Sequence, residues 1–375
     1  MKIKTFKVEQ WMNEYENDAV YNLGETCIDS MTLGELISLS GQDPKEYLSK
    51  LEDARMTYGH IYGSPELLDG IASLYKDITP GQVIPTHGAI GANHQVIVSM
   101  IEKNDNMVCV MPTYQQHYSI PESIGAEVRI IQLTPDNKFL PDIDELKRLV
   151  DKNTKMITIN NPNNPTGSFM PEEELLKIVE VAKSVGAYVL SDEVYRGLSE
   201  DGSYMTSIVD IYDKGISVGS MSKIFSLAGL RMGWIVSKDE EVIEACRNRR
   251  DYDTISCGVL DDIFSSLALK NKDKIFDRNR EILLKNRAIL DQWVNDTPEV
   301  RYIKPVAGTT ALVYYDKDIP SYDLCIKLIK EKGVLFTPGS AFEMEGCVRI
   351  GYAFDSKTLR DGLDKFTELL REMKQ

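Results

Sequence analysis

The stretch SMSKIFSLAGLRMG, residues 220–233, contains a single lysine, Lys223, close behind the hydroxyl side chains of Ser220 and Ser222. Arg231 follows eight residues later, with a glycine two residues before it and another two residues after it. A lysine whose pKa is lowered by its site becomes a nucleophile and forms a Schiff base with a carbonyl compound. Hydroxyls and a guanidinium are good donors to a phosphate, and glycines let backbone come close. A lysine that forms an imine beside donors for a phosphate indicates pyridoxal phosphate chemistry.

Two further polar clusters follow apolar strands and fit the same cofactor. SDEVY places Asp192 at a strand end, 31 residues before Lys223, where a carboxylate would keep a pyridine nitrogen protonated. Tyr195, three residues on, is a candidate for hydrogen bonding the phenolic oxygen of the ring. NNPNNPTG, residues 160–167, is expected to form a rigid turn that offers Asn164 to the same oxygen. The simpler alternatives are a helix-capping Asp192 and a purely structural turn.

The order of apolar and amphipathic segments predicts an α/β fold. Apolar runs that end in Pro, Gly or polar residues alternate with helical patterns such as PEEELLKIVEVAKSVG, residues 171–186. Strands interleaved with helices favour a sheet that is mainly parallel. In such sheets, ligands bind outside the carboxyl ends of the strands. Three polar clusters at three strand ends therefore predict one shared site.

Chain length and the later segments predict two domains. A chain of 375 residues exceeds the size at which one core usually stops growing. After a long charged helical stretch come short strands, one more helix and a closing amphipathic helix, which read as a smaller α+β unit. We expect a large domain over residues 45–275, and a small domain formed by residues 1–44 and 276–375.

Composition and charge narrow the classes of partner. The formal net charge of −15 disfavours nucleic acid and anionic membrane as partners. The six cysteines show no metal-binding spacing, which predicts reduced thiols and no metal site. The polar N-terminal segment and the lack of a long apolar run predict neither a signal peptide nor a membrane span. These features together favour a cytoplasmic protein.

Taken in order, NPNNPTG, SDEVY and SMSKIFSLAGLRMG resemble the class I/II aminotransferases, which are fold-type I pyridoxal-phosphate enzymes of the aspartate aminotransferase superfamily. The resemblance covers roughly residues 50 to 355. It includes the segments YGHIYGSPELLDGIASLY, VIPTHGAIGANHQVI, MPTYQQHY, VLFTPGSAFE and CVRIGYA. It implies a mainly parallel seven-stranded sheet flanked by helices, and a homodimer with its sites at the interface.

The resemblance also implies roles for individual residues. Lys223 would carry pyridoxal 5'-phosphate as a Schiff base, Asp192 would pair with the pyridinium nitrogen, and Tyr114 would stack on the ring. The remaining cofactor contacts would come from the side chains of Asn164, Tyr195, Ser220, Ser222 and Arg231, from the backbone of Ala89 and Ile90, and from Tyr62 of a neighbouring subunit. Arg349 would bind the substrate α-carboxylate, beside Gly24 and Asn164. The implied reaction moves an amino group between an L-amino acid and a 2-oxo acid, with Lys223 as general base.

The chain departs from the family pattern at GETCIDSMTLGEL, residues 24–36, where relatives carry a proline and an aromatic residue. This segment normally lines the pocket for the substrate side chain, and Cys27 stands within it. Cys27 is expected to be either a packed cysteine or a catalytic thiol. A C–S β-lyase or an amino-acid cyclase on the same scaffold is the alternative reaction. A regulator without activity and an NAD-type enzyme are disfavoured, because the chain lacks a DNA-binding extension and a G-x-G-x-x-G motif.

Overall fold

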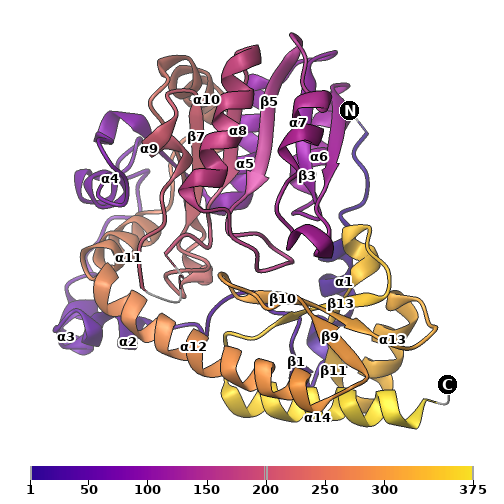
Figure 1. The fold of residues 1–375 in the computed structure, drawn as a ribbon. Coiled ribbons are helices and arrows are strands. Elements are labelled where there is room, and N and C mark those ends of the chain that lie inside the picture. The colour runs from indigo at the N-terminus through magenta and orange to yellow at the C-terminus, as the bar shows by residue number, and fades with distance from the viewer. Residues whose placement is uncertain (1, 198, 200–201, 374–375) are drawn as a thin grey trace.

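A large sheet of seven strands forms the centre of the computed structural model, which describes residues 2–197, 199 and 202–373 (Figure 1). The strands lie in the order β2-β8-β7-β6-β5-β3-β4. Their bounds are β2 (Val83–His87), β3 (Asn106–Met111), β4 (Glu127–Gln132), β5 (Thr154–Asn160), β6 (Tyr188–Asp192), β7 (Gly215–Ser220) and β8 (Met232–Ser237). β8 alone runs opposite to the other six strands, so the predicted mainly parallel α/β sheet is confirmed.

Helices cover both faces of this sheet, because its strands are apolar on both sides. Met156 packs toward one face, whereas its neighbour Ile157 packs toward the other, as the alternation of side chains along a strand requires. The flanking helices are α5 (Gly88–Met100), α6 (Gln116–Ile124), α7 (Ile143–Leu149), α8 (Glu172–Val185), α9 (Ile208–Ile211) and α10 (Glu240–Asp253). α8 begins with three glutamates and ends at Gly186 in the left-handed conformation, as its sequence predicts.

A smaller unit lies below the large sheet in Figure 1. It holds a four-stranded sheet of β9 (Val300–Tyr302), β10 (Thr310–Tyr315), β12 (Thr337–Pro338) and β13 (Cys347–Gly351), and the pair β1 (Tyr21–Asn22) and β11 (Val334–Leu335). Its helices are α1 (Lys7–Tyr15), α13 (Ser321–Lys332) and α14 (Ser356–Glu372). Because β1 pairs with β11, the N-terminal segment packs with the C-terminal unit, as we expected. The boundaries near residues 45 and 275 stay a prediction.

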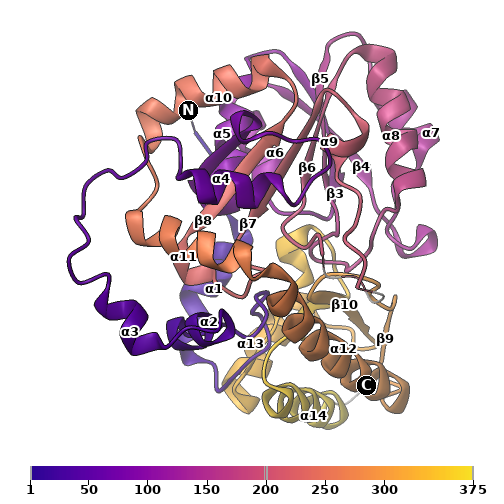
Figure 2. The ribbon, with the colours of Figure 1, turned by 90° about the vertical axis from the view of Figure 1, so that its left-hand side faces the viewer.

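Further helices connect the two units. They are α2 (Leu33–Leu39), α3 (Pro44–Ser49), α4 (Pro65–Ala72), α11 (Val259–Lys270) and α12 (Lys272–Asp296). In Figures 1 and 2, α12 runs from α11 to the small sheet, where it packs on β9 and α14. In the described part of the chain, no helix is long and apolar enough to cross a membrane.

The parallel strands bring three polar segments to one edge of the large sheet. Asn160 pairs in register with Asp192, and Asp192 pairs with Val218, two residues before Ser220. The carboxyl ends of β5, β6 and β7 therefore lie side by side. The site described next lies at this edge, facing the smaller unit.

Candidate active site

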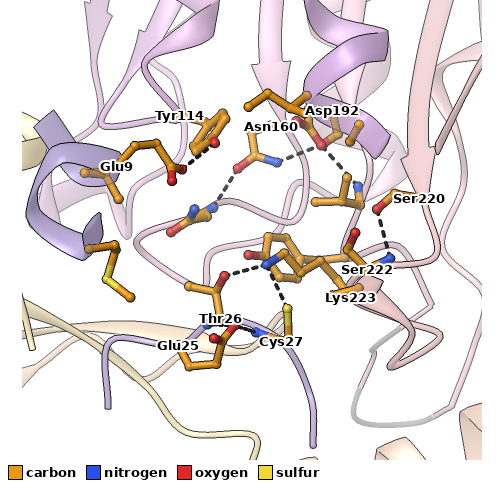
Figure 3. Close-up of a pocket in the computed structure, with 18 of the residues that line it drawn as sticks. Glu9, Glu25, Thr26, Cys27, Tyr114, Asn160, Asp192, Ser220, Ser222 and Lys223 are labelled. Carbon is orange, nitrogen blue, oxygen red and sulfur yellow. Dashed lines mark hydrogen bonds between the residues drawn. The ribbon is translucent and has the colours of Figure 1, made fainter. Parts of the chain in front are cut away.

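One cavity of about 320 Å³ gathers nearly all of the residues singled out from the sequence (Figure 3). Its lining includes Gly24, Ala89, Ile90, Tyr114, Asn164, Asp192, Tyr195, Ser220, Ser222, Lys223, Arg231 and Arg349. Tyr62 is the exception: it is exposed, and the guanidinium groups of Arg247 and Arg250 lie over its ring. The predicted role of Tyr62 at a neighbouring subunit's site stays a prediction.

Lys223 projects into the cavity from the turn after β7. Its Nζ donates hydrogen bonds to Thr26 Oγ1 at 2.6 Å and to Cys27 Sγ at 3.3 Å (Figure 3). Burial opposes the charged ammonium, but the nearby Cys27, Tyr195 and Glu25 outweigh it and raise the pKa of Lys223. The chain by itself therefore keeps this amine protonated.

The segment from Gly24 to Cys27, where the sequence departs from its relatives, forms the wall beside Lys223. Glu25 Oε1 accepts the backbone N–H groups of Thr26 and Cys27 at 3.1 and 3.0 Å. Burial raises the pKa of the Cys27 thiol, although the charge of Lys223 opposes the shift. Cys27 is therefore a neutral thiol that contacts the key amine, and the divergent segment touches the reacting centre itself.

Asp192 is held at the end of β6 by neutral partners. Its Oδ2 accepts from Asn93 Nδ2 at 2.7 Å, and its Oδ1 accepts the Val194 N–H at 3.2 Å. His117 Nε2 lies 3.7 Å from Oδ2, and neither ring nitrogen of His117 has a hydrogen-bond partner among the described residues. Asp192 is only 4% exposed, so a buried carboxylate faces the cavity without the cation that burial normally demands.

The start of α5 also lines the cavity, through Ala89 and Ile90, and the N-terminus of a helix favours anions. The first N–H groups of a helix have no partner within the helix, and here they belong to Gly88, Ala89 and Ile90. A Cβ on Gly233 would lie 2.2 Å from the carbonyl carbon of Gly88, so only glycine permits this approach. A Cβ on Gly229 would meet open space, so our expectation of close backbone there is wrong.

Arg349 is 97% buried, with its charge directed at the cavity's other wall. Its Nη2 donates to the Gly24 carbonyl at 2.8 Å and to Thr337 Oγ1 at 2.9 Å, and its Nη1 donates to Asn164 Oδ1 at 3.3 Å. Its Nε has no partner among the described residues. Burial lowers the pKa of this guanidinium, although nearby acidic groups oppose the shift. A buried arginine with no carboxylate partner is suited to a carboxylate ligand.

Several lining residues were missed in the sequence analysis. Asn160 Nδ2 donates to the Asp192 carbonyl and Asn160 Oδ1 accepts the Asn164 N–H, so it ties two strand ends together. Helix α1 adds Val8, Glu9 and Met12, and Glu9 Oε1 accepts a 2.6 Å hydrogen bond from Tyr114 (Figure 3). The helical spacing of residues 8 and 12 is a signal for one shared face, but the sequence alone does not say what that face covers.

The donor set of the cavity fits pyridoxal phosphate. Lys223 supplies a primary amine, Asp192 a buried carboxylate for a protonated ring nitrogen, and the start of α5 with Arg231 a cradle for a phosphate. Three features of the cavity agree with this cofactor. A Cβ on Gly233 would fill the space at the start of α5, the buried carboxylate of Asp192 lacks a cation, and Arg349 Nε lacks a hydrogen-bond partner among the described residues. In the described residues no group of acidic, histidine or cysteine side chains is arranged to hold a metal.

Comparison with known proteins agrees with this chemistry. The family model for aminotransferase class I and II matches residues 34–366. A crystal structure of a PLP-dependent aminotransferase from Streptococcus suis is 45% identical, with a TM-score of 0.96 and 100% of both chains covered. Capreomycidine synthase of Streptomyces vinaceus is 27% identical over 97% of this chain and 93% of its own. An aspartate aminotransferase of Thermotoga maritima is 28% identical over 87% of this chain and 86% of its own.

Proposed function

Because the chain belongs to the class I and II aminotransferase family, we propose that Lys223 binds the cofactor covalently and moves the proton in its reaction. The chain is a fold-type I, pyridoxal-phosphate-dependent aminotransferase, which transfers an amino group between an amino acid and a 2-oxo acid. When bound, pyridoxal phosphate supplies a carbonyl carbon that takes up amines and a ring that accepts an electron pair. The observation that carries the proposal is Lys223 Nζ in one cavity with Asp192 and Arg349.

Lys223 has two tasks in this proposal. Its Nζ first makes the covalent link and, once the substrate amine has replaced it, takes the proton from the substrate Cα as general base. Thr26 Oγ1 and Cys27 Sγ, which accept hydrogen bonds from Nζ in the structure, orient the amine between these steps. Nζ would then give up the same proton, and addition of water would release the 2-oxo acid, which ends the first half of the transfer.

The other residues of the cavity bind and tune the cofactor. Asp192 holds a proton on the ring nitrogen, and Asn93 and His117 orient that carboxylate. The phosphate is bound by Ser220, Ser222, Arg231 and the N–H groups of Ala89 and Ile90 at the start of α5. Asn164 and Tyr195 bind the ring oxygen, and Tyr114 covers the ring face. Arg349 binds the substrate carboxylate, held in place by its bonds to Gly24 and Asn164.

We extend the proposal to assembly and location. Tyr62 is exposed and absent from the cavity of its own chain, which supports a homodimer in which it reaches the neighbouring site. Exposed Tyr58 and Met56 lie in the same segment and would be covered in that dimer. A cytoplasmic location remains a prediction from the sequence.

The test is the substitution Lys223→Ala, with Lys152→Ala as a matched control on an exposed lysine. We expect Lys223→Ala to lose the absorbance of the lysine-bound cofactor and to lower turnover by about 10²–10⁴-fold, the usual contribution of a positioned acid–base group. The control should keep both. Full activity in the Lys223→Ala protein would refute the assignment.

A second candidate is a cyclase or C–S β-lyase on the same scaffold. It is favoured by the match to a relative named capreomycidine synthase over 97% of the chain. The two reactions differ in their need for a 2-oxo acid: an aminotransferase consumes one per turnover, whereas a cyclase or lyase needs none. Product analysis with and without added 2-oxo acid therefore separates them, and pyruvate with ammonia from cystathionine would identify the lyase.

A further inference from the structure

Three glutamates are among the residues that line the cavity. Glu9 lies in the helix, Glu16 follows its last turn, and Glu25 belongs to the divergent segment beside Lys223. Figure 3 shows Glu9 beside Tyr114, and Glu25 beside Thr26 and Cys27 near Lys223. The three carboxylates come from two segments of the chain, so the fold gathers them at one place.

Each of these carboxylates is held by hydrogen bonds from the chain. Glu9 Oε1 accepts from Tyr114 at 2.6 Å, Glu16 Oε1 accepts from Asn22 Nδ2 at 3.3 Å, and Glu25 Oε1 accepts two backbone N–H groups. The Glu25 side chain also hydrogen-bonds the Cys27 thiol. The protein thus fixes the positions of three carboxylates around the cavity.

The three charges are close enough to affect one another. Burial and the charges of Glu25 and Glu9 raise the pKa of Glu16. Lys223 and Arg349 interact with these charges in the chain by itself. Both cations are engaged when the cofactor and a substrate carboxylate bind, and a cationic group on the ligand would then offset the remaining negative charge.

Arg349 brings a positive charge to the same cavity, where it donates to the Gly24 carbonyl and feels the charges of Glu9 and Glu25. Arg349 is 97% buried there, and its Nε is left without a partner in the described residues. Val8 and Met12 of α1 give the cavity an apolar surface. A ligand with three groups would fit these surroundings: a carboxylate bound by Arg349, an apolar stem along Val8 and Met12, and a cationic end at the glutamates. Long basic side chains have this form, because they bury an apolar stem and keep a charged end in polar surroundings.

We propose that the amino donor is an α-amino acid whose side chain ends in a guanidinium or ammonium group on a methylene chain. This inference rests on the proposed function, since it assigns the substrate of the same site. Glu9, Glu16 and Glu25 share the cationic head and act as specificity residues. An acidic side chain is disfavoured in the same place, because it would add a fourth negative charge to the group.

The test compares donors whose side chains carry different charges, with arginine and citrulline as the pair of equal length. Half-reactions of the holoenzyme are followed by the cofactor spectrum with arginine, ornithine, glutamate and citrulline, the last being a neutral analogue of arginine with equal length. We expect kcat/KM for arginine or ornithine to exceed that of citrulline by about tenfold or more, as charge-assisted hydrogen bonds require. Glutamate as the best donor would overturn this inference and leave the aminotransferase assignment intact. Failure of every amino acid would overturn both.

The variant Glu16→Gln tests the carboxylates directly, because this side chain lies at the rim and contacts no reacting atom. We expect a KM for the cationic donor about fivefold higher with kcat unchanged, and no change for citrulline. Glu14→Gln is the matched control: it removes the same charge two residues earlier, in the last turn of α1 and outside the lining of the cavity. Equal KM shifts for arginine and citrulline in Glu16→Gln would contradict the proposal.

A binding measurement without turnover completes the test. 5-Guanidinopentanoate and 5-ureidopentanoate match arginine and citrulline without the reacting amine, so neither can enter the transfer. Calorimetry on the holoenzyme should give an affinity about tenfold higher for the guanidinium compound. Equal affinities would overturn the role of the glutamates whatever the activity results.

Discussion

Asp192 and Glu193 are neighbours in sequence at the end of β6, yet their carboxylates have opposite surroundings. Asp192 faces the cavity, accepts hydrogen bonds only from the neutral donors Asn93 and Val194, and has the His117 ring 3.7 Å away. Glu193 faces the interior on the other side of the sheet. Both are 4% exposed, so burial alone does not distinguish them.

The Glu193 side is a closed network. Its Oε2 pairs with Arg196 Nε at 3.0 Å and accepts from Ser217 Oγ at 2.7 Å, and its Oε1 accepts the Ile208 N–H at 2.9 Å. Arg196 donates its remaining N–H groups to two backbone carbonyls and lies over the ring of Tyr75. Every charge here has a partner from the chain itself, which is typical of a structural ion pair.

The Asp192 side is an open network. His117 has two ring nitrogens without partners, Asn93 Oδ1 has none, and across the cavity Arg349 Nε has none among the described residues. Such orphaned groups cost stability unless a ligand completes them. The comparison teaches that completeness of hydrogen bonding, rather than burial or residue type, separates the structural carboxylate from the functional one.

Glu193→Gln should give the largest loss of stability. The substitution keeps the shape but leaves the buried Arg196 without its counter-charge, which costs about 3–5 kcal/mol in comparable pairs. Denaturant unfolding of the cofactor-free protein measures the change in the free energy of unfolding. Arg148→Met, at an exposed arginine, is the control and should change it by less than about 0.5 kcal/mol. A loss near that of the control would show that the network is not structural.

Asp192→Asn, one residue earlier, should give the opposite pattern. The amide keeps the size of the side chain, and no buried cation loses its partner, so the free energy of unfolding should change by less than about 1 kcal/mol. Activity should fall by about a hundredfold or more, because a preorganised charge that stabilises the protonated ring is lost. Steady-state rates and unfolding curves of the same preparation check both halves. A large stability loss with little change in rate would reverse the comparison.

The sequence alone predicts the large sheet and most of the residues that line the cavity. Strand ends with polar clusters are local signals, and the order of parallel strands brings Asn164, Asp192 and Lys223 to one edge without further information. The glycine-flanked Arg231 was equally visible. These residues were found because each lies within a short motif whose chemistry has one good explanation.

Contacts between distant segments could not be found in this way. Glu9 reaches Tyr114, which lies 105 residues away, and Thr26 reaches Lys223, which lies 197 residues away. His117 stands inside a matched motif but has no neighbouring residue that signals its place behind Asp192. The contacts of Glu9 and Thr26 depend on how the N-terminal segment crosses between the two units, and no periodicity in a single segment encodes that path.

Substitutions of the two glycines around Arg231 test the cofactor-binding side of the cavity with the smallest expected effects. Gly233→Ala would place a Cβ 2.6 Å from the Ala89 nitrogen, so the start of α5 must shift from its position against β8. We expect a loss of about 1–3 kcal/mol in the free energy of unfolding, as for other overpacked sites, together with weaker cofactor binding because the cradle is displaced.

Gly229→Ala is the matched control, since a Cβ there meets nothing within 4 Å. It should leave cofactor affinity unchanged and alter stability by no more than about 1 kcal/mol, with a gain expected if its backbone suits alanine. Cofactor titration and unfolding of the two variants side by side give the comparison. Equal effects of the two substitutions would mean that both glycines are needed for the flexibility of the turn. An effect confined to Gly233→Ala would mean that glycine is needed at position 233 because β8 comes close to the first N–H groups of α5.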